Sequence, residues 1–212
     1  MRRDEALEII LATKVIAVIR MSDTEKLAKV AEAIKQGGVR AIEITMTTPS
    51  ALEIIAAMGK KKTAGILIGA GTVLDPETAA QAIHAGADFI VSPITNAEMI
   101  RVCRRYDIFV APGAFTPTEI VAAWEKGADV VKVFPATSVG PKYFKDIKGP
   151  LPQIRLMPTG GVSLENAREF VASGACCVAI GTALLDKKAI EAGNWDVLTQ
   201  KAGALVDSLK MK

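Results

Sequence analysis

A lysine interrupts an apolar run near the middle of the sequence. In DVVKVFPA (129–136), Lys132 has valines on both sides. An ammonium group is costly to desolvate, so such a position either lowers the lysine pKa or supplies a partner of opposite charge. A neutral lysine amine attacks a ketone and forms an imine, which draws electrons from the neighbouring carbon. Lys132 is therefore the first candidate for chemistry.

A glutamate occupies a similar position in a second apolar run. Glu43 lies between Ile42 and Ile44 in VRAIEIT (39–45). Side chains alternate between the two faces of a strand, so if the isoleucines pack against helices, Glu43 points inward together with Lys132. A buried ion pair that only fills the interior is the alternative, although desolvation can exceed its Coulomb gain. A working amine beside a carboxyl group that carries protons is the preferred interpretation.

Two glycine-rich segments near the C-terminus indicate an anion site. They are PTGGV (158–162) and AIGTAL (179–184), and each includes the end of an apolar run. Glycine lets backbone N–H groups approach phosphate oxygens, and Thr182 is expected to open a helix whose N-terminus favours an anion. Tight turns without a ligand are the alternative. The expected phosphate-binding residues are Gly160, Gly161, Gly181 and Thr182.

The elements that would position these residues alternate along the chain. Short apolar segments are each followed by a turn and an amphipathic stretch, which predicts parallel βαβ units. Glycines that end helices recur before the strands, as in GGV, AGAD, KGAD and SGAC. The expected strands are residues 15–20, 39–45, 66–71, 88–93, 107–113, 129–135, 154–161 and 177–181.

These repeated units predict an α/β fold, a closed (β/α)8 TIM barrel that forms one domain over residues 1–212. An extra N-terminal helix, EALEIILAT (5–13), is expected to cover the barrel bottom. A doubly wound open sheet is the alternative, but GxGxxG does not follow the first strand. Active sites of barrels form at the C-terminal strand ends, where Arg20, Thr47 and Thr72 also fall.

The composition argues against several classes of function. Aromatic residues make up 5% of the chain, the formal net charge is +3, and the basic residues are scattered, so no nucleic-acid partner is expected. The run KKK (60–62) is interpreted as a solvated helix end. No signal peptide and no membrane-spanning apolar run occur, and we expect a cytoplasmic protein that does not bind membranes.

Cysteine and histidine are too few for a convincing metal site. Cys103 and the adjacent pair Cys176 and Cys177 suit reduced thiols rather than a disulfide framework. His84 is the only histidine, and its helical surroundings predict a place on a helix surface. We therefore expect no metal site.

The whole chain, from VIAVIR to GTALL, resembles the 2-keto-3-deoxy-6-phosphogluconate (KDPG) / 4-hydroxy-2-oxoglutarate (KHG) aldolases. The resemblance implies a homotrimeric class I aldolase on a (β/α)8 barrel, with a lysine imine and no metal or organic cofactor. Its expected reactions give pyruvate with glyceraldehyde 3-phosphate from KDPG, and pyruvate with glyoxylate from KHG. The segments that carry the resemblance are GGVRAIEIT (37–45), IGAGTV (68–73), GADFIVSP (86–93), PGAFTPTE (112–119), VKVFPA (131–136), GPKYFKDIKGP (140–150) and PTGGV (158–162).

The resemblance also implies a role for each matching residue. Lys132 corresponds to the Schiff-base lysine, and Glu43 to the general acid/base, which works partly through water. Thr72 corresponds to a ligand of the pyruvyl carboxylate, while the alternative from spacing alone is a cap for the next helix. The two glycine segments correspond to the phosphate-binding loops. The expected pocket walls are Pro93, Phe134 and Thr159.

One position departs from the family pattern. Many members carry a carboxylate-binding arginine four residues after the glutamate, where this chain has Thr47. A threonine cannot supply that charge. Arg20 ends the first strand, next to the strand of Glu43, and a guanidinium there can hold a carboxylate with two hydrogen bonds. An arginine that only faces solvent is the alternative. We hypothesise that Arg20 and Thr47 together replace the missing arginine.

Two other functions remain as alternatives. One is another phosphate-binding barrel enzyme, such as a sugar-phosphate epimerase or a thiamine-phosphate-synthase-like transferase. The epimerase would require metal-binding histidines, and the transferase would not need a lysine within a strand. The other is a catalytically silent barrel that binds ligands or assembles with partners, against which an intact Glu43 and Lys132 argue.

Overall fold

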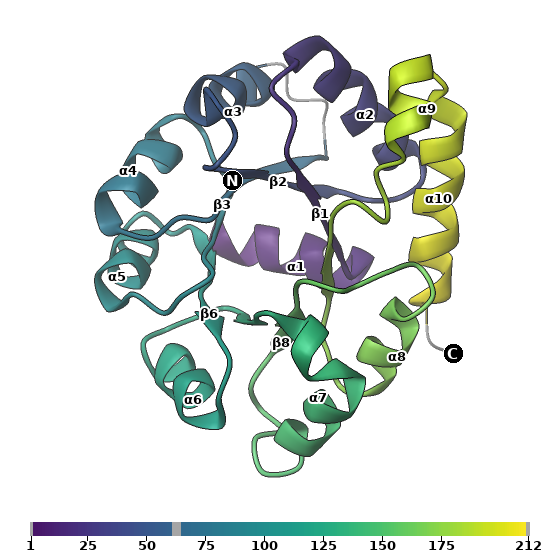
Figure 1. The fold of residues 1–212 in the computed structure, drawn as a ribbon. Coiled ribbons are helices and arrows are strands. Elements are labelled where there is room, and N and C mark those ends of the chain that lie inside the picture. Colours follow the sequence, from purple (N-terminus) through teal and green to yellow (C-terminus); the bar gives the residue numbers. More distant parts are fainter. Residues whose placement is uncertain (1, 61–64, 211–212) are drawn as a thin grey trace.

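The computed structural model describes residues 2–60 and 65–210, in which strands and helices alternate around a common centre (Figure 1). The strands are β1 (Val15–Ile19), β2 (Ala41–Thr45), β3 (Leu67–Gly71), β4 (Phe89–Val91), β5 (Phe109–Ala111), β6 (Gly113–Ala114), β7 (Val131–Val133), β8 (Leu156–Pro158) and β9 (Val178–Ile180). The helices are α1 (Arg3–Thr13), α2 (Thr24–Gln36), α3 (Ala51–Lys60), α4 (Pro76–His84), α5 (Ala97–Arg105), α6 (Pro117–Glu125), the 3-10 turn η1 (Ala136–Ser138), α7 (Gly140–Lys148), α8 (Ala167–Ala172), α9 (Lys187–Ala192) and α10 (Trp195–Ser208).

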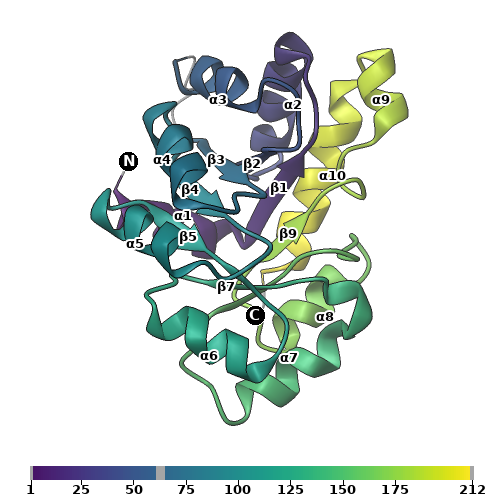
Figure 2. The ribbon, with the colours of Figure 1, turned by 60° about the vertical axis from the view of Figure 1, so that its left-hand side comes forward.

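All paired strands run parallel, and neighbours in the sheet are mostly neighbours in the chain. One sheet has the order β5-β4-β3-β2-β1-β9, and a second has the order β6-β7-β8. An isolated bridge between Thr159 and Ala179 joins the end of β8 to β9. The side view shows the strands curled, with the helices outside them (Figure 2). A doubly wound sheet would reverse its strand order near the middle, so this alternative is wrong.

The predicted fifth strand, 107–113, is divided into β5 and β6 at Pro112. Proline has no N–H group to donate to a neighbouring strand, so the ladder is interrupted there. The N–H of Gly113 turns to the carbonyl oxygen of Ile94 at 3.1 Å, while the carbonyl of Pro112 still accepts from the N–H of Lys132 at 2.9 Å. The described chain therefore has nine strand segments where eight strands were expected, and β6 lies beside the strand of Lys132.

Two buried clusters show which way each strand faces. Ile42, Ile44, Val131 and Val133 belong to the outer cluster, which they share with apolar residues of the surrounding helices. This confirms the predicted alternation. The inner cluster contains the alternate residues of the strands, such as Ala41 and Val130. Glu43 and Lys132, each two residues further along, therefore face the centre.

The N-terminal helix closes one end of the inner cluster. The helix was expected over 5–13 and spans Arg3–Thr13, where Figure 1 shows α1 lying across the strands. Ala6 and Ile10 are fully buried members of the inner cluster. The helix contributes apolar side chains to the floor beneath the strands, as predicted.

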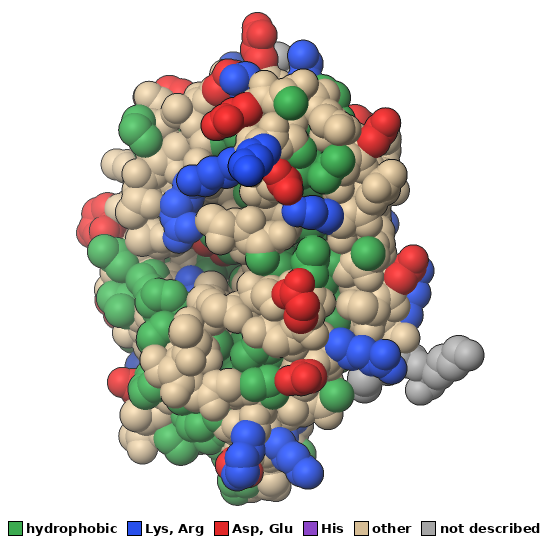
Figure 3. All heavy atoms as spheres, turned by 45° about the vertical axis from the view of Figure 1, so that its right-hand side comes forward, with side chains coloured by type: hydrophobic (Ala, Val, Ile, Leu, Met, Phe, Trp, Pro, Cys, Tyr) green, Lys and Arg blue, Asp and Glu red, His purple; other side chains and the backbone are tan. Residues whose placement is uncertain are grey.

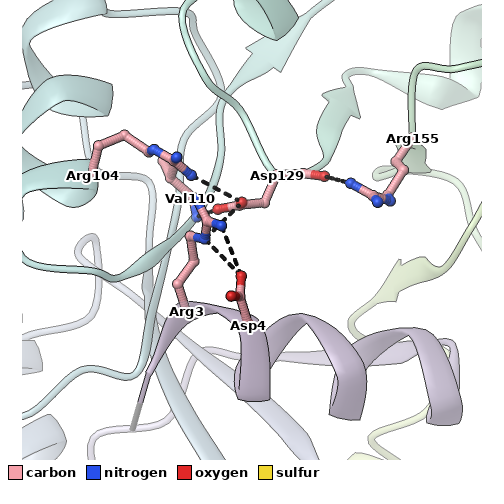
Figure 4. A network of polar contacts seen from close by, with 6 residues as sticks. All are labelled: Arg3, Asp4, Arg104, Val110, Asp129 and Arg155. Atoms are coloured by element: carbon pink, nitrogen blue, oxygen red, sulfur yellow. Dashed lines mark hydrogen bonds and ion pairs between the residues drawn. The ribbon is translucent and has the colours of Figure 1, made fainter.

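A carboxylate network ties this helix to the strands (Figure 4). Oδ1 of Asp129 lies 3.6 Å from Nε of Arg3 on α1 and 3.5 Å from a guanidinium nitrogen of Arg104 on α5. Oδ2 of Asp129 accepts the N–H of Val110 at 2.9 Å. Asp88, in the other GAD triplet, accepts the N–H of Ile68 in the same way. These two triplets therefore tie the segments that lead into β4 and β7 to β3 and β5, in addition to ending a helix.

The stability of the protein is expected to depend on pH through Asp129. Burial raises the pKa of Asp129 to about 6, although the hydrogen bond from the N–H of Val110 and the charges of nearby arginines oppose this. A carboxyl group whose pKa is raised on folding contributes most below its unfolded pKa of about 3.9, and this contribution is lost as the pH rises through about 6. We expect the Tm of the wild type to rise relative to that of Asp129→Asn between pH 7.5 and pH 4.5. The expected increase is equivalent to about 2 kcal/mol of stability. Thermal unfolding monitored by circular dichroism tests this, and a constant difference would contradict it.

Several smaller expectations can be compared with the structure. His84 is exposed at the end of α4, with its ring edge-on to Tyr106. The three cysteines form no disulfide in the structure. Lys60 ends α3, whereas Lys61 and Lys62 lie outside the described residues. Over residues 2–60 and 65–210, no helix is long and apolar enough to cross a membrane.

Candidate active site

Glu43 and Lys132 are both buried on the inner face of the strands. Their exposed fractions are 1% and 4%. Glu43 is paired in register with Gly69 of β3, and Lys132 with Gly113 of β6, so small residues lie beside both side chains. No direct ion pair joins the two side chains, although each feels the charge of the other. The alternative, in which Glu43 and Lys132 form a buried ion pair that only fills the interior, therefore lacks the ion pair itself.

The glycines of IGAGTV make room for the glutamate. A Cβ atom built on Gly71 would lie 1.8 Å from Oε1 of Glu43, and one built on Gly69 would lie 2.3 Å from the ring of Phe89. The side chain of Glu43 thus lies across the bare backbone of β3. In the sequence, IGAGTV served only as a segment of the family resemblance, and this role was not predicted for its glycines. The signal was available, since glycines two residues apart on one strand share a face.

The two titratable groups are shifted toward their neutral forms. Burial raises the pKa of Glu43, and the charges of Lys132 and Arg20 only partly oppose it. Burial lowers the pKa of Lys132, with Arg20 adding to the effect and Glu43 opposing it. The ring of Phe134 lies 5.0 Å from Nζ of Lys132, within reach of a cation–π contact. A larger share of neutral amine is the condition for nucleophilic attack on a ketone.

Two buried oxygens on this inner surface have no hydrogen-bond partner in the described residues. They are Oε2 of Glu43 and Oγ1 of Thr159. Buried polar atoms are nearly always paired, and exceptions commonly mark positions where a ligand or water binds. Thr159 follows β8 and is held by two backbone hydrogen bonds, to Val133 and from Ala136. Both oxygens are therefore available to a bound molecule.

Thr72 follows Gly71 in a backbone conformation that is unusual for its residue type. Its φ is +59°, in the left-handed region that β-branched residues rarely adopt. The next helix, α4, is capped by Asp75, which accepts the N–H of Thr78 at 2.6 Å, so the alternative that Thr72 caps it is wrong. Left-handed non-glycine residues cluster at functional sites, where the surrounding structure holds them against their strain.

Arg20 and Thr47 lie at the ends of two neighbouring strands, β1 and β2, and have different surroundings. Oγ1 of Thr47 lies 3.1 Å from Oγ1 of Thr45, which in turn lies 3.2 Å from that of Thr48. Thr47 is thus an exposed member of a hydroxyl cluster at the end of β2. Arg20 is exposed at the end of β1 and acts electrostatically on both Glu43 and Lys132. No hydrogen bond between Arg20 and Thr47 is present.

The glycine segments after β8 and β9 line one cavity of about 160 Å³. Gly160 and Gly161 both have left-handed φ values, +85° and +73°, and a Cβ on Gly161 would lie 2.7 Å from Oγ1 of Thr137. The amide of Asn166 donates to the carbonyl of Gly161 at 2.8 Å and fixes the turn. The predicted residues that line this cavity are Arg20, Phe134, Thr159, Gly160, Gly161, Gly181 and Thr182.

The prediction that Thr182 opens a helix is wrong. Thr182 lies in a single turn in which the N–H groups of Leu184 and Leu185 donate to the carbonyl of Gly181. The helix that follows, α9, begins only at Lys187, because the carboxylate of Asp186 caps it. An anion at Thr182 would therefore meet turn N–H groups and a hydroxyl rather than a helix terminus.

Pro93 lines a separate cavity of about 300 Å³ at the ends of β4 and β6. Phe134 lines this cavity as well as the glycine cavity, so its half-exposed ring stands between the two. The predicted wall residues Pro93 and Thr159 therefore line different cavities, which have Phe134 in common. In the described part of the chain, no group of three or more His, Cys, Asp or Glu side chains is arranged to hold a metal ion.

Comparison with known proteins gives a family for the chain. The family model of the KDPG and KHG aldolases matches residues 7–201. The chain belongs to this family. The match includes every candidate site residue named above, from Arg20 to Thr182.

Individual relatives cover nearly the whole chain of this family member. A 2-dehydro-3-deoxy-phosphogluconate aldolase of Pseudomonas aeruginosa is 38% identical over 184 residues, 86% of this chain and 83% of the relative. A KHG/KDPG aldolase of Escherichia coli K12 is 33% identical over 99% of this chain and 98% of its own. The crystal structure of a KDPG aldolase of Legionella pneumophila, with pyruvate captured as a covalent carbinolamine, superposes with a TM-score of 0.86. That structure is 30% identical and covers 94% of this chain and 97% of its own.

Proposed function

We propose that this protein is a class I aldolase that cleaves KDPG to pyruvate and glyceraldehyde 3-phosphate, and KHG to pyruvate and glyoxylate. One observation carries the proposal. Lys132 is buried on the inner face of β7 with a lowered pKa, and the carboxyl group of Glu43 shares that face. The family and the carbinolamine in the Legionella relative support the same chemistry.

The reaction begins with formation of an imine. The neutral amine of Lys132 adds to the C2 carbonyl, and loss of water gives a protonated imine. Glu43, through a water molecule, removes the proton of the C4 hydroxyl. The C3–C4 bond breaks, its electron pair moves into the iminium to form an enamine, and the aldehyde departs. Glu43 returns a proton to C3, and hydrolysis frees pyruvate and the lysine.

The remaining residues bind the two ends of the substrate. We propose that Thr72, with Arg20 and Thr47, binds the carboxylate and that the turns at Gly160 and Gly181 bind the phosphate. Pro93, Phe134 and Thr159 would form the walls near the reacting carbons. Binding at the remote phosphate positions the bond to be broken, so part of that binding energy lowers the barrier. No metal or organic cofactor is required, because the protonated imine accepts the electron pair.

A direct assay tests the proposed function. The purified protein is mixed with KDPG, with its C4 epimer 2-keto-3-deoxy-6-phosphogalactonate, and with KHG. Pyruvate release is followed through lactate dehydrogenase and NADH. We expect pyruvate from KDPG, and the ratio of kcat/KM values assigns the preferred epimer. If none of the three acids releases pyruvate, the silent-barrel alternative replaces the aldolase.

Arg20 gives a prediction for the carboxylate end. Arg20→Ala should raise KM for the keto acid about tenfold, because it removes a charge-assisted hydrogen bond to a carboxylate. The control is Arg101→Ala, since Arg101 is exposed on α5 and pairs with Glu98. Initial rates over a range of substrate concentration separate KM from kcat. An unchanged KM would show that Arg20 does not replace the family arginine.

We further infer the architecture and assembly. The two sheets adjoin at Pro112, between β5 and β6, and at the bridge between Thr159 and Ala179. Together they would form one closed (β/α)8 barrel and a single domain over residues 1–212. A homotrimer is proposed from the family, with the exposed side chains of Ile94 and Phe115 as candidate interface residues. Light scattering should then give three times the chain mass of 22.4 kDa. A cytoplasmic location remains a prediction from the sequence.

A further inference from the structure

A larger cavity, of about 460 Å³, adjoins the glycine cavity. It lies between the loop after β1 and the segment that leads from β9 into α9. Val18, Arg20 and Thr182 line both cavities. The larger cavity is also lined by Lys26 of α2 and Lys187 of α9. The two cavities therefore form one cleft that runs outward from the proposed phosphate end.

This cleft has more cationic than anionic side chains. Arg20, Lys26 and Lys187 are exposed on it, and none forms an ion pair with a carboxylate of the described residues. Of the two acidic side chains that line it, Asp23 accepts hydrogen bonds from two N–H groups in the first turn of α2. Glu191 is the other. Figure 3 shows Lys and Arg side chains gathered beside a hollow on this side of the molecule.

The glycine cavity alone cannot balance the charge of a phosphate group. Its lining contains neutral N–H groups, hydroxyls and apolar side chains, and Arg20 is its one charged residue. A phosphate monoester carries a charge of about −1.5 to −2 at pH 7. The adjoining cavity adds two further cations to the cleft, Lys26 and Lys187.

We propose that Lys26 and Lys187 determine the preference of the enzyme for phosphorylated over unphosphorylated substrates. The inference rests on the proposed function and deepens it. The two ammonium groups complement the second charge of a phosphate seated at Gly160, Gly161 and Thr182. They also draw the dianion toward the cleft, because clustered like charges at a cleft raise the local concentration of an oppositely charged ligand. Glu191, on the same rim, opposes them.

The test compares one acid with and without its phosphate, KDPG and 2-keto-3-deoxygluconate. The double variant Lys26→Gln, Lys187→Gln should raise KM for KDPG about five- to tenfold, with kcat and the unphosphorylated substrate unaffected. Glu191→Gln should lower KM for KDPG, an effect of opposite sign. The matched control is Lys188→Gln, because Lys188 is exposed on α9 but does not line the cleft. Added salt should weaken the wild-type preference and leave that of the double variant nearly unchanged.

The KM values test the role of Lys26 and Lys187, and borohydride trapping tests the aldolase function separately. An unchanged KM for KDPG in the double variant, or an equal increase for both substrates, would overturn the assignment of Lys26 and Lys187. Trapping of pyruvate on Lys132 by borohydride is measured in parallel, in the wild type and the double variant. Trapping in both proteins shows that the proposed chemistry stands whatever the KM values do. Absence of trapping in the wild type removes the aldolase function itself, and the inference with it.

Discussion

Lys132→Met is expected to abolish aldol cleavage, with kcat lowered by at least about 10⁴-fold. Methionine has similar length and no amine, so it cannot form the imine on which every later step depends. The fold should survive, because replacing a buried charged group with an apolar one of similar volume is often neutral or stabilising. The measurement is pyruvate release, with Tm from circular dichroism to show that the variant is folded.

A surface lysine provides the matched control for this experiment. Lys126 follows α6 and is exposed, so Lys126→Met should keep wild-type activity. A folded Lys132→Met protein that retained more than about a hundredth of wild-type activity would contradict imine catalysis at this position. It would favour a phosphate-binding barrel enzyme of another mechanism.

Glu43→Gln is expected to lower kcat by about 10²- to 10⁴-fold, the usual contribution of a general acid/base. Glutamine has nearly the same shape, so it can still lie across the bare backbone of Gly71. The variant should still form the imine, only slowly, because Lys132 retains its place. The charge of Glu43 raises the pKa of Lys132, so its removal should lower that pKa further.

Two readouts separate proton transfer from damage to the fold. The exchange of pyruvate methyl protons with deuterium, followed by NMR, reports protonation of the enamine and should fall together with cleavage. Pyruvate trapping on Lys132 should persist in the same sample. If exchange stayed at the wild-type rate, Glu43 would not be the group that carries the proton.

Strand periodicity explains why the inner placement of the two candidate residues could be predicted. Glu43 lies between isoleucines, and Lys132 lies between valines, and a period of two assigns such neighbours to the helix-covered side. The structure confirms this for Ile42, Ile44, Val131 and Val133. A helix over 5–13 was also predicted to cover the barrel bottom, and the structure has α1 there, from Arg3 to Thr13.

Other features depend on contacts that no local pattern contains. The division of the fifth strand follows from Pro112. The hydrogen bond from the N–H of Gly113 to the carbonyl of Ile94 could not be predicted, because Ile94 follows a different strand. The start of α9 was misplaced because Asp186, and not Thr182, supplies the capping oxygen. In both cases hydrogen-bond partners decided between local alternatives that the sequence alone left nearly equal.

The position of long exposed side chains is the least predictable part of the site. Arg20 was expected at the carboxylate end with Thr47, and in the structure it lines the glycine cavity while acting on Glu43 and Lys132 from a distance. The end of β1 fixes its backbone, but its flexible side chain can serve either end of the substrate. The KM of Arg20→Ala for KDPG and for unphosphorylated KHG separates these two roles, because loss of a carboxylate contact raises both values and loss of a phosphate contact raises only the first.

The most direct test of the central claim is to trap the imine. The protein is incubated with pyruvate and sodium borohydride, digested, and analysed by mass spectrometry. The proposal predicts a reduced pyruvyl adduct on Lys132 and on no other lysine, together with loss of activity. A folded protein that remains active and unmodified after this treatment, or an adduct on a different lysine, would contradict the assignment of Lys132 as the nucleophile.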